Sequence, residues 1–250
     1  MKVIAVNGTS NSGKTTICEV IIKGLRNKGY SVGSVKEIHC LDFALDPDLS
    51  TNTGRHKVAG SQLVTARAFS ETDILYQSKL SMEEILKHYD YDYVILEGVP
   101  DCNAPRIITG HDEQELQERI DDRAIAISGV FANEHLGQFS GLPIFNAMEE
   151  PKALVEFVEK KAFRPLPSFD KECCGECGYS CRELAGKIAQ NEAAHEDCVL
   201  FCQDVELFMD GTSVEMVPFV QAILKNAVLA VASELRGFKK QSKIEVRFRI

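Results

Sequence analysis

The sequence has no tryptophan and no apolar run that approaches the roughly 20 residues of a membrane-spanning helix. It also has no excess of positive charge: 28 lysines and arginines stand against 37 aspartates and glutamates, for a net charge of -9. Because non-specific binding to DNA or RNA needs a basic surface, nucleic acid is not expected as the main partner. The sequence therefore predicts neither a membrane protein nor a nucleic-acid-binding protein.

The first residues, MKVIAVNG, place one lysine directly before a glycine-rich turn, which is not the pattern of a signal peptide. We therefore expect a cytoplasmic protein. Cysteine, by contrast, is abundant, with nine residues in the chain and six of them between Cys173 and Cys202. Structural disulfides are rare in the cytoplasm, so this concentration favours a metal or cluster site.

The 250 residues, 44% of them hydrophobic, are enough to bury a real core in one or two domains. In the first part of the chain, short β-rich runs alternate with segments of helical periodicity, which predicts a doubly wound α/β domain. The expected strands are 2–7, 31–38, 91–98, 105–110, 123–131 and 142–146. The expected helices are 15–30, 112–120 and 149–163.

The segment RPLPSFD at 164–170 contains two prolines and marks a boundary. We therefore predict three parts: an α/β domain at 1–163, a small cysteine-rich domain at 164–202 and an α+β tail at 203–250. In the tail, residues 204–217 alternate around Asp210-Gly211, a hairpin signal. Residues 218–235 carry an apolar helical stripe that we expect to pack on the tail's own sheet, and 243–250 alternate as a last strand.

The segment Gly8-x4-Gly13-Lys14-Thr15 fits the P-loop pattern, with an expected strand before it and a helix after it. In a P-loop, backbone N–H groups turn inward around phosphate oxygens and the helix adds its positive dipole end. Lys14 would neutralise phosphate charge, including the charge that develops during hydrolysis, and the Thr15 hydroxyl would reach Mg²⁺. The predicted nucleotide-binding residues are Gly8, Asn11, Ser12, Gly13, Lys14, Thr15 and Thr16.

A P-loop needs a carboxylate near its metal, and the hydrophobic run DYVILEG offers Asp92 and Glu97. Glu97 is favoured because it follows the strand, where open α/β sheets bind their ligands. It would hold Mg²⁺ or orient a water molecule, so Lys14 and Glu97 are the predicted catalytic residues of a slow nucleotide hydrolase. The P-loop does not choose between GTP and ATP, and the chain has no Asn-Lys-x-Asp motif. Residues 131–137 are a candidate for a loop that contacts the base.

Four segments in order, GTSNSGKTT, VGSVKEIH, DYVILEGVP and NAPRI, resemble the landmarks of the MobB family, the molybdopterin-guanine dinucleotide biosynthesis proteins B. The resemblance covers roughly residues 1–162. It implies a GTP-binding P-loop protein of the dimeric SIMIBI type, an accessory in attaching a nucleotide to molybdopterin. Carried over by position, residues 8–16 would bind phosphates and Glu97 would sit at the metal.

The departures from the family pattern concern the substrate side more than the phosphate side. The family's Lys-His pair after the second strand is Lys36-Glu37 here, with His39 two residues on. Its Asp-rich loop is replaced by residues 46–56, which keep Asp46 as a carboxylate that could approach the metal. Residues 59–61 match the family's Ala-Gly pair.

Cys174-x2-Cys177-x3-Cys181-x16-Cys198 is the strongest set of four ligands in the cysteine region. Glycines beside these cysteines permit N–H contacts to anionic sulfur, and Cys181 opens an expected helix whose positive end favours an anionic cluster. Zinc is an alternative to iron–sulfur, because Cys-x2-Cys-Gly is also the pattern of a zinc knuckle. The third possibility is that these cysteines are free structural thiols without a metal. Iron–sulfur is favoured because zinc ribbons usually bring a second Cys-x2-Cys pair.

Residues 166–200 also resemble a four-iron, four-sulfur domain of corrinoid iron–sulfur proteins. That resemblance implies a [4Fe–4S] cluster on Cys174, Cys177, Cys181 and Cys198. Cys173 could replace Cys174 as a ligand. Cys202 is expected to be a buried packing residue, and Cys18 and Cys40 are expected to be thiols of the core or of a loop. Cys102 could bridge two subunits of a dimer through a cluster.

The predicted protein is a P-loop (SIMIBI-type) α/β domain followed by an iron–sulfur domain and an α+β tail. Its predicted function is that of a GTP-binding accessory protein in molybdenum or tungsten cofactor biosynthesis. The alternatives are a nucleotide-driven redox or metallocluster-maturation factor and a nucleotide-switched scaffold without turnover. The expected cofactors are GTP or ATP, Mg²⁺ and the cluster. The expected partners are a second copy of the chain and molybdopterin or a cofactor-biosynthesis protein.

Overall fold

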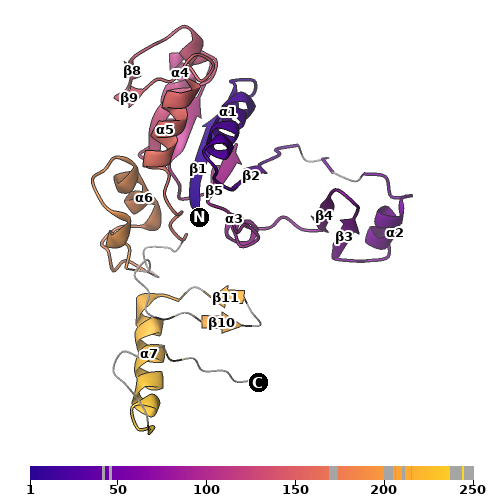
Figure 1. Cartoon of the computed structure of the whole chain (residues 1–250), viewed down its shortest axis with the longest axis vertical. Coiled ribbons are helices and arrows are strands. Elements are labelled where there is room, and N and C mark those ends of the chain that lie inside the picture. Colours follow the sequence, from indigo (N-terminus) through magenta and orange to yellow (C-terminus); the bar gives the residue numbers. More distant parts are fainter. Residues whose placement is uncertain are drawn as a thin grey trace.

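The centre of the molecule is a five-stranded parallel sheet with the strand order β2-β5-β1-β6-β7 (Figure 1). The computed structural model describes residues 1–40, 43–44, 47–168, 174–199, 205, 207–209, 212–214, 216–236 and 244. Every neighbouring pair of the sheet is parallel. Its strands are β1 (Lys2–Gly8), β2 (Val32–Lys36), β5 (Tyr93–Glu97), β6 (Arg106–Thr109) and β7 (Ala124–Ser128).

Helices cover both faces of the sheet, which is why its central strands read as continuous apolar runs. On one face, α1 (Lys14–Asn27) and α5 (Pro151–Lys161) pack side by side, with Ile21 and Leu154 in one core cluster (Figure 1). On the other, Met82 of α3 (Met82–Leu86) packs with residues of β1 and β5. Leu116 of α4 (Glu113–Gln117) joins a third cluster with β6 and β7. This arrangement confirms the predicted P-loop α/β fold.

A long excursion between β2 and β5 was not predicted. It contains α2 (Asn52–Val58) and an antiparallel hairpin of β3 (Leu63–Arg67) and β4 (Thr72–Tyr76). The hairpin and α2 project away from the sheet (Figure 1). Val64 alternates with exposed neighbours and is 3% exposed, so a period-two pattern was present in the sequence but was too short to stand out.

The end of the α/β domain differs in detail from the expectation. After β7, the 3₁₀ turn η1 (Phe131–Asn133) leads to two short strands, β8 (Gln138–Phe139) and β9 (Leu142–Pro143), which pair antiparallel. The strand expected at 142–146 is therefore only two residues long, with one further parallel bridge from Ile144 to Ile127.

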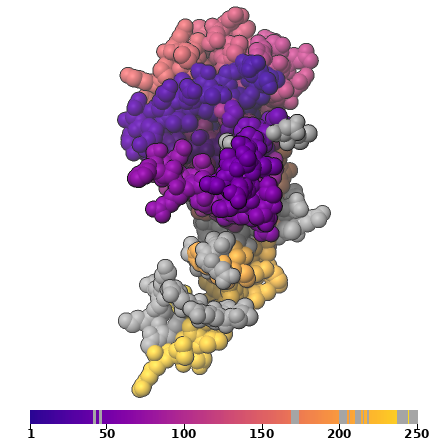
Figure 2. All heavy atoms as spheres, turned by 90° about the vertical axis from the view of Figure 1, so that its right-hand side faces the viewer, coloured from indigo at the N-terminus to yellow at the C-terminus, as the bar shows by residue number. Residues whose placement is uncertain are grey.

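Beyond α5 the chain forms α6 (Cys181–Ala189), the 3₁₀ turn η2 (His195–Asp197), the hairpin β10 (Leu207–Met209) with β11 (Thr212–Val214), and α7 (Pro218–Ala232). The predicted hairpin and helix of the tail are thus present. Figures 1 and 2 place α7 at the end of the molecule away from α1.

The apolar stripe of α7 is not packed as expected. Where its side chains are described they are largely exposed, for example Ile223 at 53% and Val231 at 68%. Of the last expected strand, 243–250, only Ile244 belongs to the described residues. Among all the residues that the structure describes, no helix combines the length and apolarity needed to span a membrane.

Candidate functional site

The P-loop between β1 and α1 is shaped by backbone geometry that few residues tolerate. Gly13 has φ +97°, a left-handed value that favours glycine, and Asn11 has φ +59°. A Cβ atom on Gly8 would lie 2.1 Å from the carbonyl oxygen of Thr109, so a side chain there would displace the neighbouring strand. These positions explain the spacing of the glycines in the motif.

Ser12, predicted to bind nucleotide, is fully buried and fastens the loop to β6. Its hydroxyl donates to the carbonyl oxygen of Thr9 at 2.8 Å and lies 2.6 Å from the hydroxyl of Thr109. Its side chain therefore supports the loop from beneath. Any contact of Ser12 with a phosphate would come from its backbone.

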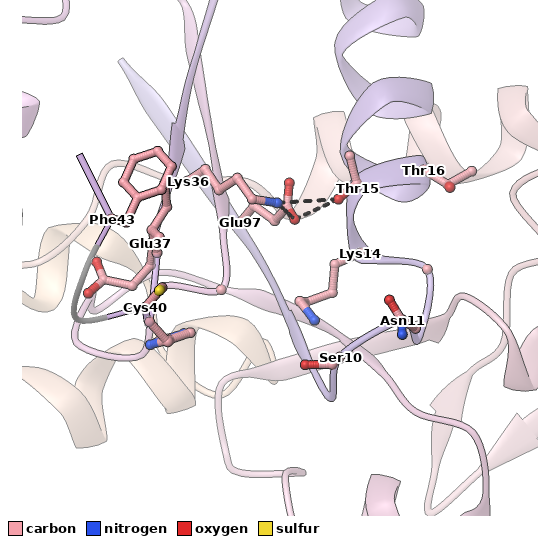
Figure 3. Close-up of a pocket in the computed structure, with 14 residues that line it drawn as sticks. Ser10, Asn11, Lys14, Thr15, Thr16, Lys36, Glu37, Cys40, Phe43 and Glu97 are labelled. Carbon is pink, nitrogen blue, oxygen red and sulfur yellow. Dashed lines mark hydrogen bonds and ion pairs between the residues drawn. The ribbon is translucent and has the colours of Figure 1, made fainter. Parts of the chain in front are cut away.

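The open side of the loop borders a cavity of about 700 Å³ at the carboxyl edge of the sheet (Figure 3). Five of the seven predicted nucleotide-binding residues line it, Asn11, Gly13, Lys14, Thr15 and Thr16, and the predicted metal ligand Glu97 lines it from the end of β5. Gly8 and Ser12 do not line it. Ser10, within the segment 8–16 that the family resemblance assigned to phosphates, also lines it. The lining residues that the sequence did not assign to nucleotide binding are Lys36, Glu37, Ile38, His39, Cys40, Phe43 and Gly98.

Thr15 and Glu97, the two predicted magnesium ligands, are in direct contact. The Thr15 hydroxyl donates to Oε1 of Glu97 at 2.7 Å, and the ammonium of Lys36 pairs with the same oxygen (Figure 3). Burial acts to raise the pKa of Glu97, but the hydrogen bonds from Lys36 and Thr15 outweigh it and leave this pKa below its ordinary value. Glu97 is therefore a carboxylate at neutral pH, as a metal ligand must be.

The other candidate carboxylate, Asp92, lies just before the amino end of β5. It accepts hydrogen bonds at 2.8 Å from the backbone N–H and from the hydroxyl of Ser31. This contact closes the turn before β2, at the edge of the sheet opposite the cavity. The geometry agrees with the preference for Glu97.

Lys14 and Thr9 are held from two sides. The ammonium of Lys14 donates to the carbonyl oxygen of Thr9, and burial is the main cause that lowers the pKa of Lys14. The Thr9 hydroxyl donates to Glu115 of the α4 helix at 2.7 Å. That bond, together with one from the backbone N–H of His111, lowers the pKa of Glu115 to about 2. No sequence pattern pointed to Glu115, because its contact with Thr9 spans a hundred residues of chain.

Of the remaining candidate site residues in the first part of the chain, some line the cavity and others do not. His39 and Cys40 line the cavity. His56 lies in α2, on the projecting excursion, and Asp46 lies outside the described residues. Residues 131–137 do not line the cavity, although the N–H of Val130 donates to the carbonyl oxygen of Ser12 at 3.0 Å and so places this loop beside the P-loop.

The four predicted cluster ligands gather in one place. Cys174, Cys181 and Cys198 are buried in a single cluster with Leu166 and Leu184, and Cys177 packs against it. Cys181 is the first residue of α6, whose start is fixed by a capping box between Ser180 and Glu183. Four neighbouring thiols, one of them at the positive end of α6, form a donor set that suits an anionic iron–sulfur cluster. Even so, no three His, Cys, Asp or Glu side chains in the described ranges already have the arrangement of a metal site.

The other cysteines differ from this group. Cys18 and Cys102 are buried, and burial raises the pKa of each thiol to about 12, so neither is a thiolate at neutral pH. Cys102 is 4% exposed, so its thiol is buried within this chain. Cys173 and Cys202 lie outside the described residues.

The cysteine region is fastened to the amino-end edge of the sheet, opposite the nucleotide cavity. The side-chain amide of Asn103 donates to the carbonyl oxygen of Pro167 at 2.8 Å, directly before the cysteines. From α6, Gln190 donates to the carbonyl oxygens of Asp122 and Ala124 at 3.0 and 2.9 Å. The two candidate sites therefore share one framework but lie at opposite ends of its strands.

Comparison with known proteins gives the family. The model described as "Molybdopterin guanine dinucleotide synthesis protein B" (MobB) matches residues 3–129, and the model described as "Putative Fe-S cluster" matches residues 170–200. A Methanocaldococcus jannaschii protein named "Putative molybdopterin-guanine dinucleotide biosynthesis adapter protein" is 29% identical over 253 residues, covering 98% of this chain and 97% of that protein.

A shorter relative matches part of the chain. The "Probable molybdopterin-guanine dinucleotide biosynthesis adapter protein" of Bacillus subtilis is 26% identical over 164 residues, covering 62% of this chain and 90% of its own length. The crystal structure of Bacillus subtilis MobB has a TM-score of 0.51 at 22% identity and covers 64% of this chain and 98% of that one, a likeness of fold. The chain thus belongs to the MobB family of molybdopterin guanine dinucleotide synthesis proteins B and carries an iron–sulfur domain after its P-loop domain.

Proposed function

We propose that this protein is a GTP-binding accessory protein of molybdenum or tungsten cofactor biosynthesis that carries a [4Fe–4S] cluster. The observation that carries the proposal is the 2.7 Å contact between Thr15 and Glu97 at the mouth of a P-loop cavity. A hydroxyl after the P-loop lysine and a carboxylate on the neighbouring strand are the groups with which such proteins hold a nucleotide-bound metal. The assignment to molybdenum or tungsten cofactor biosynthesis rests on membership of the MobB family.

Within this proposal each P-loop residue has a definite task. Lys14 neutralises phosphate charge, while the backbone N–H groups of Gly13, Lys14 and Thr15 and the start of α1 bind phosphate oxygens. Thr15 and Glu97 hold Mg²⁺, or Glu97 orients the attacking water. When bound, Mg²⁺ neutralises charge on the β- and γ-phosphate oxygens.

We expect hydrolysis to be slow. The cavity as described is lined by two lysines, Lys14 and Lys36, and by no arginine that could neutralise the transferring phosphoryl group. An added arginine commonly accelerates phosphoryl transfer by several orders of magnitude. A partner protein that supplied such a group would be needed for fast turnover.

In the cysteine region, Cys174, Cys177, Cys181 and Cys198 are the proposed cluster ligands. A [4Fe–4S] cluster held by these thiolates would exchange single electrons or cross-link the region. The division at 163 and 202, assembly as a homodimer, cytoplasmic location and a partner that is molybdopterin or a cofactor-biosynthesis protein belong to the same proposal. The name of the Methanocaldococcus relative, an adapter protein similar over its whole length, supports the partner assignment.

The second candidate function is a nucleotide-driven redox or metallocluster-maturation factor. The firm attachment of the cysteine region to the sheet favours it, since Asn103 and Gln190 both hydrogen-bond across that boundary. A region fixed in this way could respond to nucleotide at the other end of the strands. A scaffold that binds nucleotide without turnover is the third candidate.

One preparation tests these readings together. The protein is purified without oxygen, its metal content is measured, and the nucleotide that co-purifies is identified. Binding of GTP and ATP is then measured by calorimetry, and hydrolysis is measured with and without molybdopterin. GTP binding together with hydrolysis that depends on molybdopterin supports the first function. Hydrolysis independent of molybdopterin supports the second, and binding without hydrolysis supports the third.

A further inference from the structure

We propose that Lys36 is a built-in substitute for the magnesium ion: its ammonium neutralises Glu97 while the metal is absent and yields this position when Mg²⁺ arrives with the nucleotide. The inference rests on the proposed nucleotide-binding function and deepens it. It assigns a role to a residue outside the P-loop motif.

The position of the ammonium is the first argument. Lys36 Nζ forms an ion pair with Oε1 of Glu97 and lies 3.5 Å from the hydroxyl of Thr15 (Figure 3). Glu97 and Thr15 are the two side chains proposed to hold Mg²⁺. A single cation thus contacts both of these groups, from the side of β2.

The fold places Lys36 there by register. In the parallel pairing of β2 with β5, the last residues of the two strands, Lys36 and Glu97, are direct partners. Their side chains therefore leave neighbouring strands at the same height, at the edge of the sheet where the P-loop ends. The pair would be lost if the strands shifted by one residue.

Electrostatics supplies the reason for such a cation. The Glu97 side chain is only 11% exposed and would stand as a poorly solvated negative charge at the entrance to a phosphate site. Like charges at such distances repel strongly when water is scarce, so an unneutralised Glu97 would oppose phosphate binding. With Lys36 in contact, the charge of the carboxylate is neutralised, so Glu97 does not repel an incoming diphosphate.

The same geometry requires the ammonium to move. Oε1 of Glu97 already accepts from both Lys36 and Thr15, so a metal ion that binds through this oxygen must take the place of one of them, and the ammonium is the one that the metal's charge repels. The Lys36 side chain is 55% exposed and lines the cavity, which leaves it room to swing and keeps it within the phosphate site.

The test is the dependence of nucleotide affinity on magnesium. The dissociation constant of guanosine diphosphate is measured by calorimetry in EDTA and in excess Mg²⁺. The value in EDTA divided by the value in Mg²⁺ is the ratio that is compared among variants. Lys36→Met should raise this ratio by about tenfold or more, because binding without metal then meets an unneutralised Glu97. Lys36→Arg, which keeps the charge, should leave the ratio close to that of the unmodified protein.

Two controls separate this effect from a change in surface charge or fold. Lys79→Met removes an ammonium that pairs with Glu37 on the rim of the same cavity, at 2.7 Å, and should not change the ratio. Adding Glu97→Gln should cancel the effect of Lys36→Met, because Lys36 is proposed to act through that carboxylate. A ratio unchanged in Lys36→Met, or an effect that persists with Glu97→Gln, overturns the inference. Failure of the unmodified protein to bind any guanine or adenine nucleotide overturns the proposed function instead.

Discussion

Arg182, the residue after the proposed cluster ligand Cys181, donates from its guanidinium to Oδ2 of Asp121 at 3.2 Å. The same oxygen accepts from Arg106 at 3.2 Å and from Arg123 at 2.7 Å. Arg106 and Arg123 are almost fully buried, at 6% and 2% exposure. Burial lowers the pKa of Arg106 to about 10, and the positive charge of Arg123 adds to this effect. One carboxylate therefore balances several guanidinium groups where the sheet meets α6.

Asp121→Asn should destabilise the protein by roughly 3 kcal/mol, the scale expected when a buried ion pair loses one partner. The substitution leaves Arg106 and Arg123 buried without a negative charge. Arg182→Ala is the matched control: its side chain is 60% exposed, so its loss should cost under about 1 kcal/mol. Urea unfolding of both variants measures the difference. Equal costs for the two would show that the buried pairs contribute no more than the exposed one.

The same carboxylate predicts a pH dependence. Burial acts to raise the pKa of Asp121, but the hydrogen bond and the charges of Arg123 and Arg106 outweigh it and lower this pKa in the folded protein. A lowered folded pKa stabilises the protein above the unfolded value of about 3.9, and this stabilisation is lost as the pH falls through the folded value. The gap in unfolding free energy between the unmodified protein and Asp121→Asn should therefore narrow as the pH falls below about 4. A gap that is constant from pH 7 to 3 would contradict this assignment.

Lys14→Ala should weaken binding of GTP or ATP by roughly 10- to 100-fold, the range for loss of a charge-assisted hydrogen bond. Calorimetry measures the affinity. Circular dichroism should show an unchanged fold, because this ammonium donates its hydrogen bond to the Thr9 carbonyl on its own loop. Lys23→Ala, on the exposed side of the same helix, is a control that should bind nucleotide normally. Unchanged affinity in Lys14→Ala would remove the P-loop assignment.

What could be predicted from the sequence was local. The strand, loop and helix around Gly13 follow from a short motif and its immediate periodicity, and β5 follows from a single apolar run. Lys36 was noted only as the lysine of a family Lys-His pair, because its contact with Glu97 depends on the register of two strands and joins residues 61 positions apart. The Asp121 network was invisible for the same reason. The stripe of α7 was read as core from its period alone, yet period cannot show whether a helix has something to pack against.

Anaerobically purified protein should be brown and contain about four irons per chain, since a [4Fe–4S] cluster uses four cysteine ligands. Cys177→Ser and Cys181→Ser should each lose the colour and most of the iron. Cys18→Ser is the control, because Cys18 belongs to the core beneath the P-loop and not to the cysteine cluster. Visible absorption and metal analysis measure both quantities. Colourless protein with one zinc per chain would favour the zinc-knuckle reading.

The last prediction concerns the connection between the two ends of the sheet. The segment 98–105 runs from Glu97, at the nucleotide cavity, to Arg106, at the edge where the cysteine region is attached. Protein groups hold it along its length: Asn7 donates to the carbonyl oxygen of Val99 at 2.9 Å, and Arg123 donates to that of Cys102 at 3.0 Å. Asn103 then contacts the chain that leads to the cysteines. A movement of Glu97 with the nucleotide would therefore reach the cluster region through this segment.

Nucleotide should consequently shift the reduction potential of the cluster. By reciprocity, the factor by which nucleotide changes reduction must equal the factor by which reduction changes nucleotide affinity. The potential is measured without nucleotide, with the diphosphate and with a non-hydrolysable triphosphate, and Lys14→Ala serves as a control in which the shift should vanish. A fivefold change in affinity corresponds to a shift of about 40 mV for a one-electron couple, for which tenfold is 59 mV. A potential constant within about 10 mV would leave the cluster as a structural cross-link, because coupling that weak could not transmit the state of either site.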